Sequence, residues 1–381
     1  VYTIPGSVTA VGNRAFSRCA YLREIAVPRR VTTIGEYAFE SCWRLTDMVI
    51  PDNVTAFGEG AFADCVNLTN ITMPSAVNIS DHAFSGCGRL RDITIPAGAT
   101  SIGESAFSGC SGLRSVSIPD GVTEVGDMAF MYCGSLAEIT IPSGVTAIGD
   151  SVFSFCAGLT DVTIPEGVTS IGIRAFAQCN RLVNIAIPSS VTVIRSGAFE
   201  YCGRLTNVAV PAGVTSIGSG VFYNDERLRE IVVAEGNAGY ASRDGVLFDK
   251  DMKTLICYPQ GKESSVYVIP GGVTRIGNGA FSGCDNLTDI TISGNVTRIG
   301  DDAFEYCENL TDVTIPDSVT SIGYGAFSNC KNLANITIPP NVTSIGIGAF
   351  YDCENLVIRG SENSRAASFA RDYGIGFEPA E

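Results

Sequence analysis

Apolar residues recur along this chain with a period of 23 residues. The proline of an apolar–proline dipeptide marks the period, at Pro5, Pro28, Pro51, Pro74, Pro96, Pro119, Pro142, Pro165, Pro188, Pro211, Pro270, Pro316 and Pro339, with Ser293 in the remaining slot. The step is 22 residues between Pro74 and Pro96, and 59 residues between Pro211 and Pro270. A fixed period of this length is typical of stacked repeat architectures. The pattern predicts fourteen repeats over residues 1–360, interrupted by one irregular 36-residue unit at residues 233–268.

Each repeat combines two short extended segments with a turn. In a representative repeat, Val145–Ile148 and Leu159–Ile164 are rich in β-branched residues, which favours short strands. Between them, Phe153 and Cys156 are three residues apart, a spacing that predicts a single helical turn. So few apolar residues cannot bury a core within one repeat, but stacked copies can cover one another. The sequence therefore predicts a solenoid of short stacked strands, turns and single helical turns.

Phenylalanine and cysteine occupy fixed positions in these repeats. One Phe occurs in every repeat, at Phe16, Phe39, Phe62, Phe84, Phe107, Phe130, Phe153, Phe176, Phe199, Phe222, Phe281, Phe304, Phe327 and Phe350. Thirteen of the 14 cysteines follow that Phe by three residues; Asp225 takes the position in repeat ten, and Cys257 lies in the irregular unit. Thirteen thiols in one column cannot all pair, which favours small buried thiols over disulfides. A metal site is the other alternative, but the chain has no CxxC pair.

Composition narrows the range of functions. The chain has 381 residues, 45% of them hydrophobic and 17% charged, with a formal net charge of −15. This charge argues against a nucleic-acid partner, because phosphate backbones require basic surfaces. No apolar run approaches the roughly 18 residues of a membrane-spanning helix, so we expect no membrane insertion within this chain. His82 is the only histidine, and no convergent set of titratable groups is evident. We therefore expect no enzyme, no catalytic residue, no metal and no cofactor.

The repeat unit resembles a known family. Its segments IP, VTxIG, AFxxC and LTxIT, in this order, resemble the BspA-like leucine-rich repeat family, also called the Treponema pallidum type. The irregular segment Gly236–Lys262 and the tail Val357–Phe377 also resemble parts of that family. The resemblance implies a leucine-rich-repeat solenoid, secreted or displayed on a bacterial cell surface. It implies adhesion or binding to a host or neighbouring-cell protein or glycan, without shared catalytic residues. The alternative is a passive spacer that displays other domains of a larger surface protein.

The two ends of the chain carry separate predictions. Val1–Thr9 closely matches Val266–Thr274, which follows the irregular unit, so we expect residues 1–381 to be a processed or trimmed piece of a longer precursor. Residues 361–381 are predicted to form a C-terminal cap. Within them, Ser364–Tyr373 is expected to be a short helix that covers the last repeat with Ala367, Phe369, Ala370 and Tyr373.

Candidate binding residues are those that face outward and depart from the repeat. The first group lies in the turn around the core Phe and comprises Met128, Met131, Tyr132 and Phe155, with Tyr201 and Tyr223 further along the chain. Exposed aromatic residues and Met favour interfaces, although packing into the turn is the alternative.

The second group is a column in the strand that follows each core Phe. Eight of its thirteen residues are acidic: Glu24, Asp47, Asp92, Glu138, Asp161, Glu230, Asp289 and Asp312. A strip that improves solubility is one interpretation. A docking face for a basic partner or a divalent cation is the other, with Glu138, Asp161, Asp289 and Asp312 as the candidates.

Overall fold

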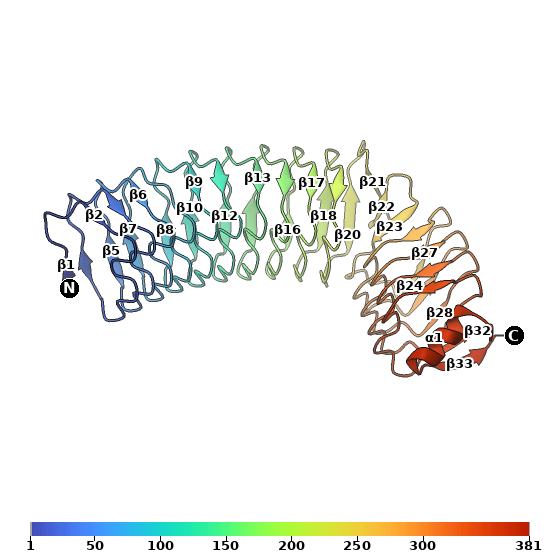
Figure 1. Ribbon diagram of the computed structural model, residues 1–381. Helices are drawn as coiled ribbons and strands as arrows, with labels where there is room; N and C mark the ends of the chain where they lie inside the picture. The colour runs from blue at the N-terminus through green and yellow to red at the C-terminus, as the bar shows by residue number, and fades with distance from the viewer. Residues whose placement is uncertain (1, 381) are drawn as a thin grey trace. The chain divides into compact units, whose positions relative to one another are not determined.

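The computed structural model describes residues 2–380 of the chain. Its contacts divide the chain into two compact units, Val1–Cys202 and Gly203–Glu381. In each unit the chain coils so that consecutive repeats lie side by side, and short parallel strands recur once per turn of the coil (Figure 1). The repeat solenoid predicted from the 23-residue period is confirmed.

Two rows of short strands run through the first unit. The row formed by the VTxIG segments contains β2 (Ala10–Val11), β4 (Thr33–Ile34), β6 (Ala56–Phe57), β9 (Ser101–Ile102), β11 (Glu124–Val125), β13 (Ala147–Ile148), β15 (Ser170–Ile171) and β17 (Val193–Ile194). The row formed by the LTxIT segments contains β1 (Tyr2–Thr3), β3 (Ile25–Ala26), β5 (Asp47–Val49), β7 (Asn70–Thr72), β8 (Asp92–Thr94), β10 (Ser115–Ser117), β12 (Glu138–Thr140), β14 (Asp161–Thr163) and β16 (Asn184–Ile185). Paired strands are parallel, and partners such as Glu138 and Asp161 are one repeat apart.

The second unit repeats the same two rows. The first row contains β19 (Ser216–Ile217), β25 (Arg275–Ile276), β27 (Arg298–Ile299), β29 (Ser321–Ile322) and β31 (Ser344–Ile345). The second row contains β18 (Asn207–Val210), β20 (Glu230–Val233), β24 (Val266–Val268), β26 (Asp289–Thr291), β28 (Asp312–Thr314), β30 (Asn335–Thr337), β32 (Val357–Gly360) and β33 (Gly376–Pro379).

The irregular unit inserts antiparallel hairpins into this stack. Strand β21 (Tyr240–Arg243) pairs with β22 (Val246–Asp249), and β22 pairs with β23 (Thr254–Cys257). Strand β23 then pairs in parallel with β25, with Leu255 opposite Ile276, so the repeat ladder resumes. Tyr258 takes the place of a core Phe, because its ring stacks on Phe281 with centroids 5.2 Å apart.

The core of each unit is built from columns of identical residues. The rings of Phe39 and Phe62 lie 5.3 Å apart at 4°, and both side chains are fully buried. The second unit continues this pattern, with Phe281 and Phe304 stacked at 4.9 Å. Each Phe therefore fills the space between its two neighbours, and this stacking is why a repeat cannot bury its core alone.

The cysteine column has a hydrogen-bonding role. The thiol of Cys65 donates to the carbonyl of Phe39 at 3.1 Å, and the thiol of Cys133 donates to that of Phe107 at 3.2 Å. The same bond recurs between other adjacent repeats, for example from Cys307 to Phe281. A small thiol thus fills the core and gives a buried carbonyl an additional donor. Two thiols of the column depart from the predicted burial, because Cys19 is exposed in the first repeat and Cys353 is half-buried in the last one.

The segment around each core Phe differs from the predicted helical turn. The N–H of Ser154 donates to the carbonyl of Ser151, and that of Cys156 to the carbonyl of Phe153, each at 3.1 Å. These are i→i+3 bonds, but Ser151 has φ 55° and Phe155 has φ 61°. Residues in the left-handed region cannot continue a right-handed helix. The segment is therefore a pair of tight turns, which three-residue spacing alone did not distinguish from a helix.

The single helix of residues 2–380 lies near the C-terminus. Helix α1 (Arg365–Tyr373) begins after Ser364, whose side chain accepts a hydrogen bond from the N–H of Ala367. Its buried residues are Ala366, Phe369 and Ala370. Of the four residues expected to cover the last repeat, Phe369 and Ala370 are buried, Ala367 is half-buried, and Tyr373 is exposed with its ring stacked on Phe369. Phe369 meets the last core Phe, Phe350, edge to face at 5.8 Å.

Candidate functional site

Two residues of every repeat adopt left-handed backbone conformations, two positions before and two positions after the core Phe. In repeat six these residues are Met128, with φ 56°, and Tyr132, with φ 61°. The second set, here called the +2 column, consists of Arg18, Ser41, Asp64, Gly86, Gly109, Tyr132, Phe155, Gln178, Tyr201, Asn224, Gly283, Tyr306, Asn329 and Asp352.

Backbone bonds hold this conformation in place. The N–H groups of Met128, Phe130 and Tyr132 donate to carbonyls of the next repeat at 2.9, 3.0 and 2.9 Å. Adjacent turns therefore form a ladder of their own beside the two rows of strands. The side chains of the +2 column project from this ladder one repeat apart, at a spacing of about 4.8 Å.

The aromatic members of the +2 column are unusual for their backbone geometry. Glycine adopts the left-handed region without steric conflict, as Gly86 and Gly109 do with φ 73° and 74°. A bulky L-residue there loses about 1–2 kcal/mol through contact between its Cβ and the backbone. Tyr132 and Phe155 occupy these positions without filling the core, since their side chains are 48% and 38% exposed. Bulky residues that stay partly exposed in a strained backbone position favour a role at the surface.

Tyr132 and Phe155 form one surface feature, here called the aromatic patch. Their ring centroids are 4.5 Å apart, and the ring planes differ by 25°. The structure thus brings together two of the four turn residues that the sequence proposed. Met128 and Met131 are half-buried beside them in the chain and present less surface.

The two other aromatic candidates differ from each other. Tyr201 is exposed and lies in the +2 column, two repeats after Phe155. Tyr223 is half-buried, and its hydroxyl donates to the carboxylate of Glu305 at 3.1 Å, so it has a structural contact. The periodic rule also identifies Tyr306, which is 41% exposed and which the sequence reading passed over.

The acidic candidates lie on a different part of the repeat, in the second row of strands. Glu138 is directly opposite Asp161 in the β12–β14 pair, and Asp289 is opposite Asp312 in the β26–β28 pair. All four are exposed. Asp312 also accepts a hydrogen bond from the Asn335 side chain at 2.8 Å.

Other carboxylates of that column also accept hydrogen bonds from the polar residue of the next repeat. The Asn70 side chain donates to Asp47 at 2.7 Å, and Ser115 donates to Asp92 at 2.8 Å. Hydrogen bonds from Asn70 and Thr46 lower the pKa of Asp47. Polar neighbours therefore stabilise several carboxylates within the column itself, which is consistent with the interpretation as a solvated strip.

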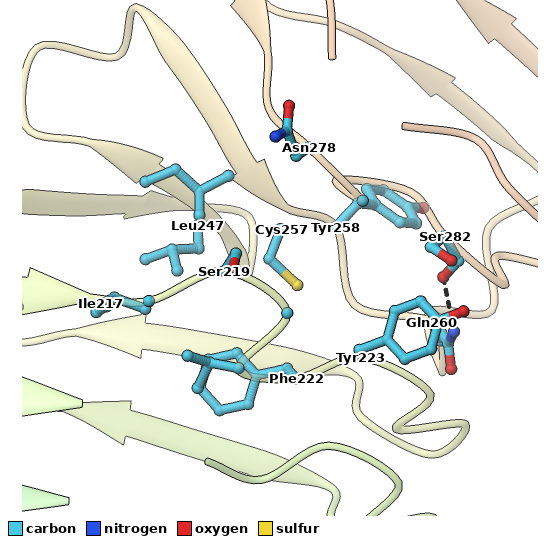
Figure 2. Close-up of a pocket in the computed structure, with 15 residues that line it drawn as sticks. Ile217, Ser219, Phe222, Tyr223, Leu247, Cys257, Tyr258, Gln260, Asn278 and Ser282 are labelled. Carbon is cyan, nitrogen blue, oxygen red and sulfur yellow. Dashed lines mark hydrogen bonds between the residues drawn. The ribbon is translucent and has the colours of Figure 1, made fainter. Parts of the chain in front are cut away.

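A small cavity lies in the second unit where the irregular unit meets repeats ten and eleven (Figure 2). Its volume is about 60 Å³, and Cys257, Tyr258, Gln260 and Ser282 line it. The hydroxyls of Tyr258 and Ser282 are buried without a protein partner, and the Gln260 side chain donates to the Ser282 carbonyl at 2.6 Å. A polar cavity of this size suits ordered water rather than an organic substrate.

The thiol in this cavity is not activated. Burial, reinforced by the charge of Asp225, raises the pKa of Cys257 to about 12. A thiol with such a pKa stays protonated at neutral pH and is a poor nucleophile. Within residues 2–380, no group of three or more His, Cys, Asp or Glu residues is placed to hold a metal ion.

Comparison with known proteins agrees with this architecture. The family model described as a BspA-type leucine-rich repeat region matches residues 2–114, 77–202, 155–241 and 259–363. These overlapping matches include most of the chain. The chain belongs to the BspA-type leucine-rich repeat family. The columns of core Phe, Cys and Pro residues are therefore features of the BspA-type repeat in this chain.

Solved structures of leucine-rich repeat proteins resemble this chain. A leucine-rich cell surface protein from Faecalibacterium prausnitzii is 30% identical, with 97% of this chain and 89% of that chain covered and a TM-score of 0.58. A leucine-rich repeat protein from Bacteroides ovatus is 26% identical, with coverage of 100% and 92% and a TM-score of 0.57.

A third structure is similar in fold but has a lower sequence identity. The pneumococcal vaccine antigen PcpA is 20% identical, with coverage of 88% and 89% and a TM-score of 0.55. The comparison with curated proteins finds no match. Among the described residues of this BspA-type chain, no helix is long and apolar enough to cross a membrane.

Proposed function

We propose that this chain is an extracellular binding module that attaches to a protein or glycan partner through the aromatic patch, without catalysis. The observation that carries the proposal is the stacked, exposed pair of Tyr132 and Phe155 in left-handed backbone positions. Both rings remain partly exposed in these strained positions, which supports a role at the surface in addition to packing. Aromatic side chains often dominate the energy of an interface.

The secreted or cell-surface location is part of the same proposal. The similar Faecalibacterium prausnitzii protein is described as a cell surface protein. Leucine-rich repeat solenoids offer long, rigid surfaces, which suits attachment to another macromolecule. The formal net charge of −15 favours a protein or glycan partner over a nucleic acid.

The acidic pairs provide a rival surface. Glu138 and Asp161 are adjacent and exposed, and Asp289 and Asp312 form a similar pair in the second unit. A basic partner would be attracted to either pair, and this attraction would accelerate association at low salt.

A passive spacer is the alternative function. The observation that favours it is the monotony of much of the surface, where Thr hydroxyls donate to the preceding repeat again and again, as Thr192 does to Thr169 and Thr320 does to Thr297. Such ladders stiffen a solenoid without recognising a ligand.

The test begins with a screen of purified extracellular proteins and a glycan array against the whole chain. A confirmed partner is then measured against the triple variant Met131→Ser, Tyr132→Ser and Phe155→Ser. We expect tenfold or greater weakening, since exposed aromatic anchors often contribute more than about 1.4 kcal/mol.

Matched controls separate the patch from general surface effects. Tyr306→Ser removes an aromatic ring from the same column in the second unit, and it should leave affinity unchanged. A second triple variant, Glu138→Asn, Asp161→Asn and Asp289→Asn, tests the acidic surface through the salt dependence of the on-rate. Binding that neither triple variant alters would refute both assignments. A chain with no partner in the screen would support the spacer.

A further inference from the structure

The +2 column of the first unit contains an opening next to the aromatic patch. Phe155 covers one face of the Tyr132 ring. The preceding residue of the column on the other side is Gly109, and the one before that is Gly86. A side-chain carbon added at Gly109 would meet only the backbone of Gly86, 3.6 Å away. The position of the column next to Tyr132, on the side away from Phe155, therefore has no side chain.

A carboxylate bounds the other side of this opening. A side-chain carbon added at Gly86 would collide with Oδ1 of Asp64, so the Asp64 side chain lies over Gly86. Asp64 is exposed, and it makes no ion pair with any residue that the structure describes. We call the space above Gly109, between the Asp64 carboxylate and the Tyr132 ring, the Gly109 notch.

The backbone under the notch is rigid. The N–H of Gly109 donates to the Met131 carbonyl at 2.7 Å, and the N–H of Gly86 donates to the Ser108 carbonyl at 2.7 Å. The floor therefore belongs to the turn ladder and offers no free donor to an anion. A carboxylate on one side and the negative face of an aromatic ring on the other attract the same kind of ligand, which is a cation.

The spacing of the column suits a long basic side chain that bridges the two boundaries. Gly86 and Tyr132 are two repeats apart, which is about 10 Å at the usual strand spacing. A cation centred above Gly109 would lie about 5 Å from each of these two column positions, and the N–H groups of a guanidinium would extend further toward the carboxylate that lies over Gly86. Cation–π attraction extends to about 6 Å from a ring centroid.

The chain builds a comparable arrangement from its own residues. The guanidinium of Arg14 lies 4.7 Å from the centroid of the Tyr37 ring and 3.3 Å from the carboxylate of Glu40. Tyr37 also has a left-handed backbone, with φ 52°, two positions before its core Phe. The turn surface of this solenoid can therefore hold an arginine between a ring and a carboxylate.

The second unit has the same glycine but no opening. Gly283 precedes Tyr306 in the column, as Gly109 precedes Tyr132. A side-chain carbon added at Gly283 would collide with the Gln260 amide, so the irregular unit fills this space. The open notch is thus particular to the first unit.

We propose that the Gly109 notch receives an arginine or lysine side chain of a protein partner, held between the Asp64 carboxylate and the free face of Tyr132. This inference rests on the proposed binding function and specifies its partner as a polypeptide with an exposed basic residue. The net charge of −15 adds a long-range attraction for such a partner.

The first test uses blocked tetra-arginine peptide as the probe and tetra-citrulline as its uncharged counterpart. Titration of the whole chain at low salt is followed by calorimetry and by the amide NMR shifts of Gly86 and Gly109. We expect saturable binding of tetra-arginine that shifts both amides and weakens with salt. Equal binding of tetra-citrulline, or absence of saturable binding, would overturn the proposal.

Variants then locate the site. Asp64→Asn and Tyr132→Ser should each weaken tetra-arginine binding about two- to fivefold, the range of one exposed ion pair or cation–π contact. Gly109→Gln should fill the notch and abolish the shifts; Gln178 has φ 62° in the same column, so the backbone accepts glutamine. Circular dichroism confirms that each variant is folded.

Controls use the same changes elsewhere in the column. Asp352→Asn alters the charge equally, and Tyr306→Ser removes an equivalent ring, so both should bind tetra-arginine as the parent chain does. If these control variants lost as much affinity for tetra-arginine as the notch variants, binding would be due to general electrostatic attraction, and the proposal would be overturned.

A confirmed natural partner separates the two levels of the hypothesis. If the triple serine variant of the aromatic patch loses that partner while Asp64→Asn and Gly109→Gln retain it, the binding function stands and the notch does not hold the partner. A glycan that binds the patch in this way would be one such outcome.

Discussion

Alkaline pH should unfold this solenoid through its cysteine column. Eleven of the 14 cysteines are buried, and each of these eleven thiols donates to a carbonyl, as Cys110 does to Phe84. Burial raises the pKa of Cys110 and of Cys156 from 9.0 to about 12. The folded state therefore keeps these protons where the unfolded chain releases them.

The sign and size of the effect follow from proton linkage. Because the folded pKa lies above the unfolded pKa, this contribution is fully present below pH 9 and is lost as pH rises toward 12. Each such thiol removes about 1.4 kcal/mol of stability per pH unit in that window. Ten buried thiols of the column have a pKa raised by burial, so their contributions add in the same direction. We expect the stability of the solenoid to fall steeply above pH 9.

Urea denaturation at pH 7, 8.5, 9 and 9.5, followed by circular dichroism under reducing conditions, measures how steeply the free energy of unfolding falls with pH. Tyrosines and lysines also titrate in this range, so the decisive comparison is the double variant Cys110→Ala and Cys156→Ala. Between pH 9 and 9.5 its slope should be shallower by about one to one and a half protons, or roughly 1.4–2 kcal/mol per pH unit, because the unfolded thiols are only partly ionised there. The exposed Cys19 provides the matched control, and Cys19→Ala should leave the slope unchanged. A double variant with the parent slope would refute the proton-linkage argument.

The remaining predictions concern the thiols, the core and the cap. A thiol reagent at pH 7.5 should label Cys19 first and the half-buried Cys353 more slowly, with close to fourteen thiols reacting after denaturation; early labelling of the whole column would contradict the buried ladder. Phe176→Ala should lower the free energy of unfolding by about 3–5 kcal/mol, because this fully buried ring stacks on both neighbours. Phe16→Ala, at a half-buried ring, should lower it by less than half as much in the same urea titration; equal losses would show that stacking position does not matter. Removal of residues 361–381 should expose the last repeat, lower the melting temperature and promote association in light scattering; an unchanged monomer would show that the tail is not a cap.

Some side-chain roles could be predicted from the sequence, and others needed the packed structure. The 23-residue period shows that Cys133 and Cys156 are equivalent, because identical spacing forces identical environments in a stack. It does not show that each thiol donates to the carbonyl of the preceding core Phe, which depends on the direction of the Sγ atom. Likewise, the outward positions of Tyr132 and Phe155 could be inferred, but the stacking of their rings could not.

The Gly109 notch is the clearest example of a feature that could not be predicted from the sequence. In the sequence, Gly109 is one of 42 glycines, and nothing marks it as different from Gly283. Both occupy the same position of the repeat. Only the packed structure shows that the Gln260 amide fills the space above Gly283 and that no side chain fills the space above Gly109.

The 23-residue period is enough to predict the solenoid, the number of its repeats and the columns of its core, because a periodic chain can bury its apolar residues only by stacking equivalent copies. The backbone conformation of the turns depends on the packed structure. Three-residue spacing suits a helical turn and a pair of tight turns equally, and hydrogen bonds to the next repeat select the second. The packed structure also decides which surface positions are open, because a gap depends on what neighbouring repeats place there, and that information is distributed over residues far apart in the chain.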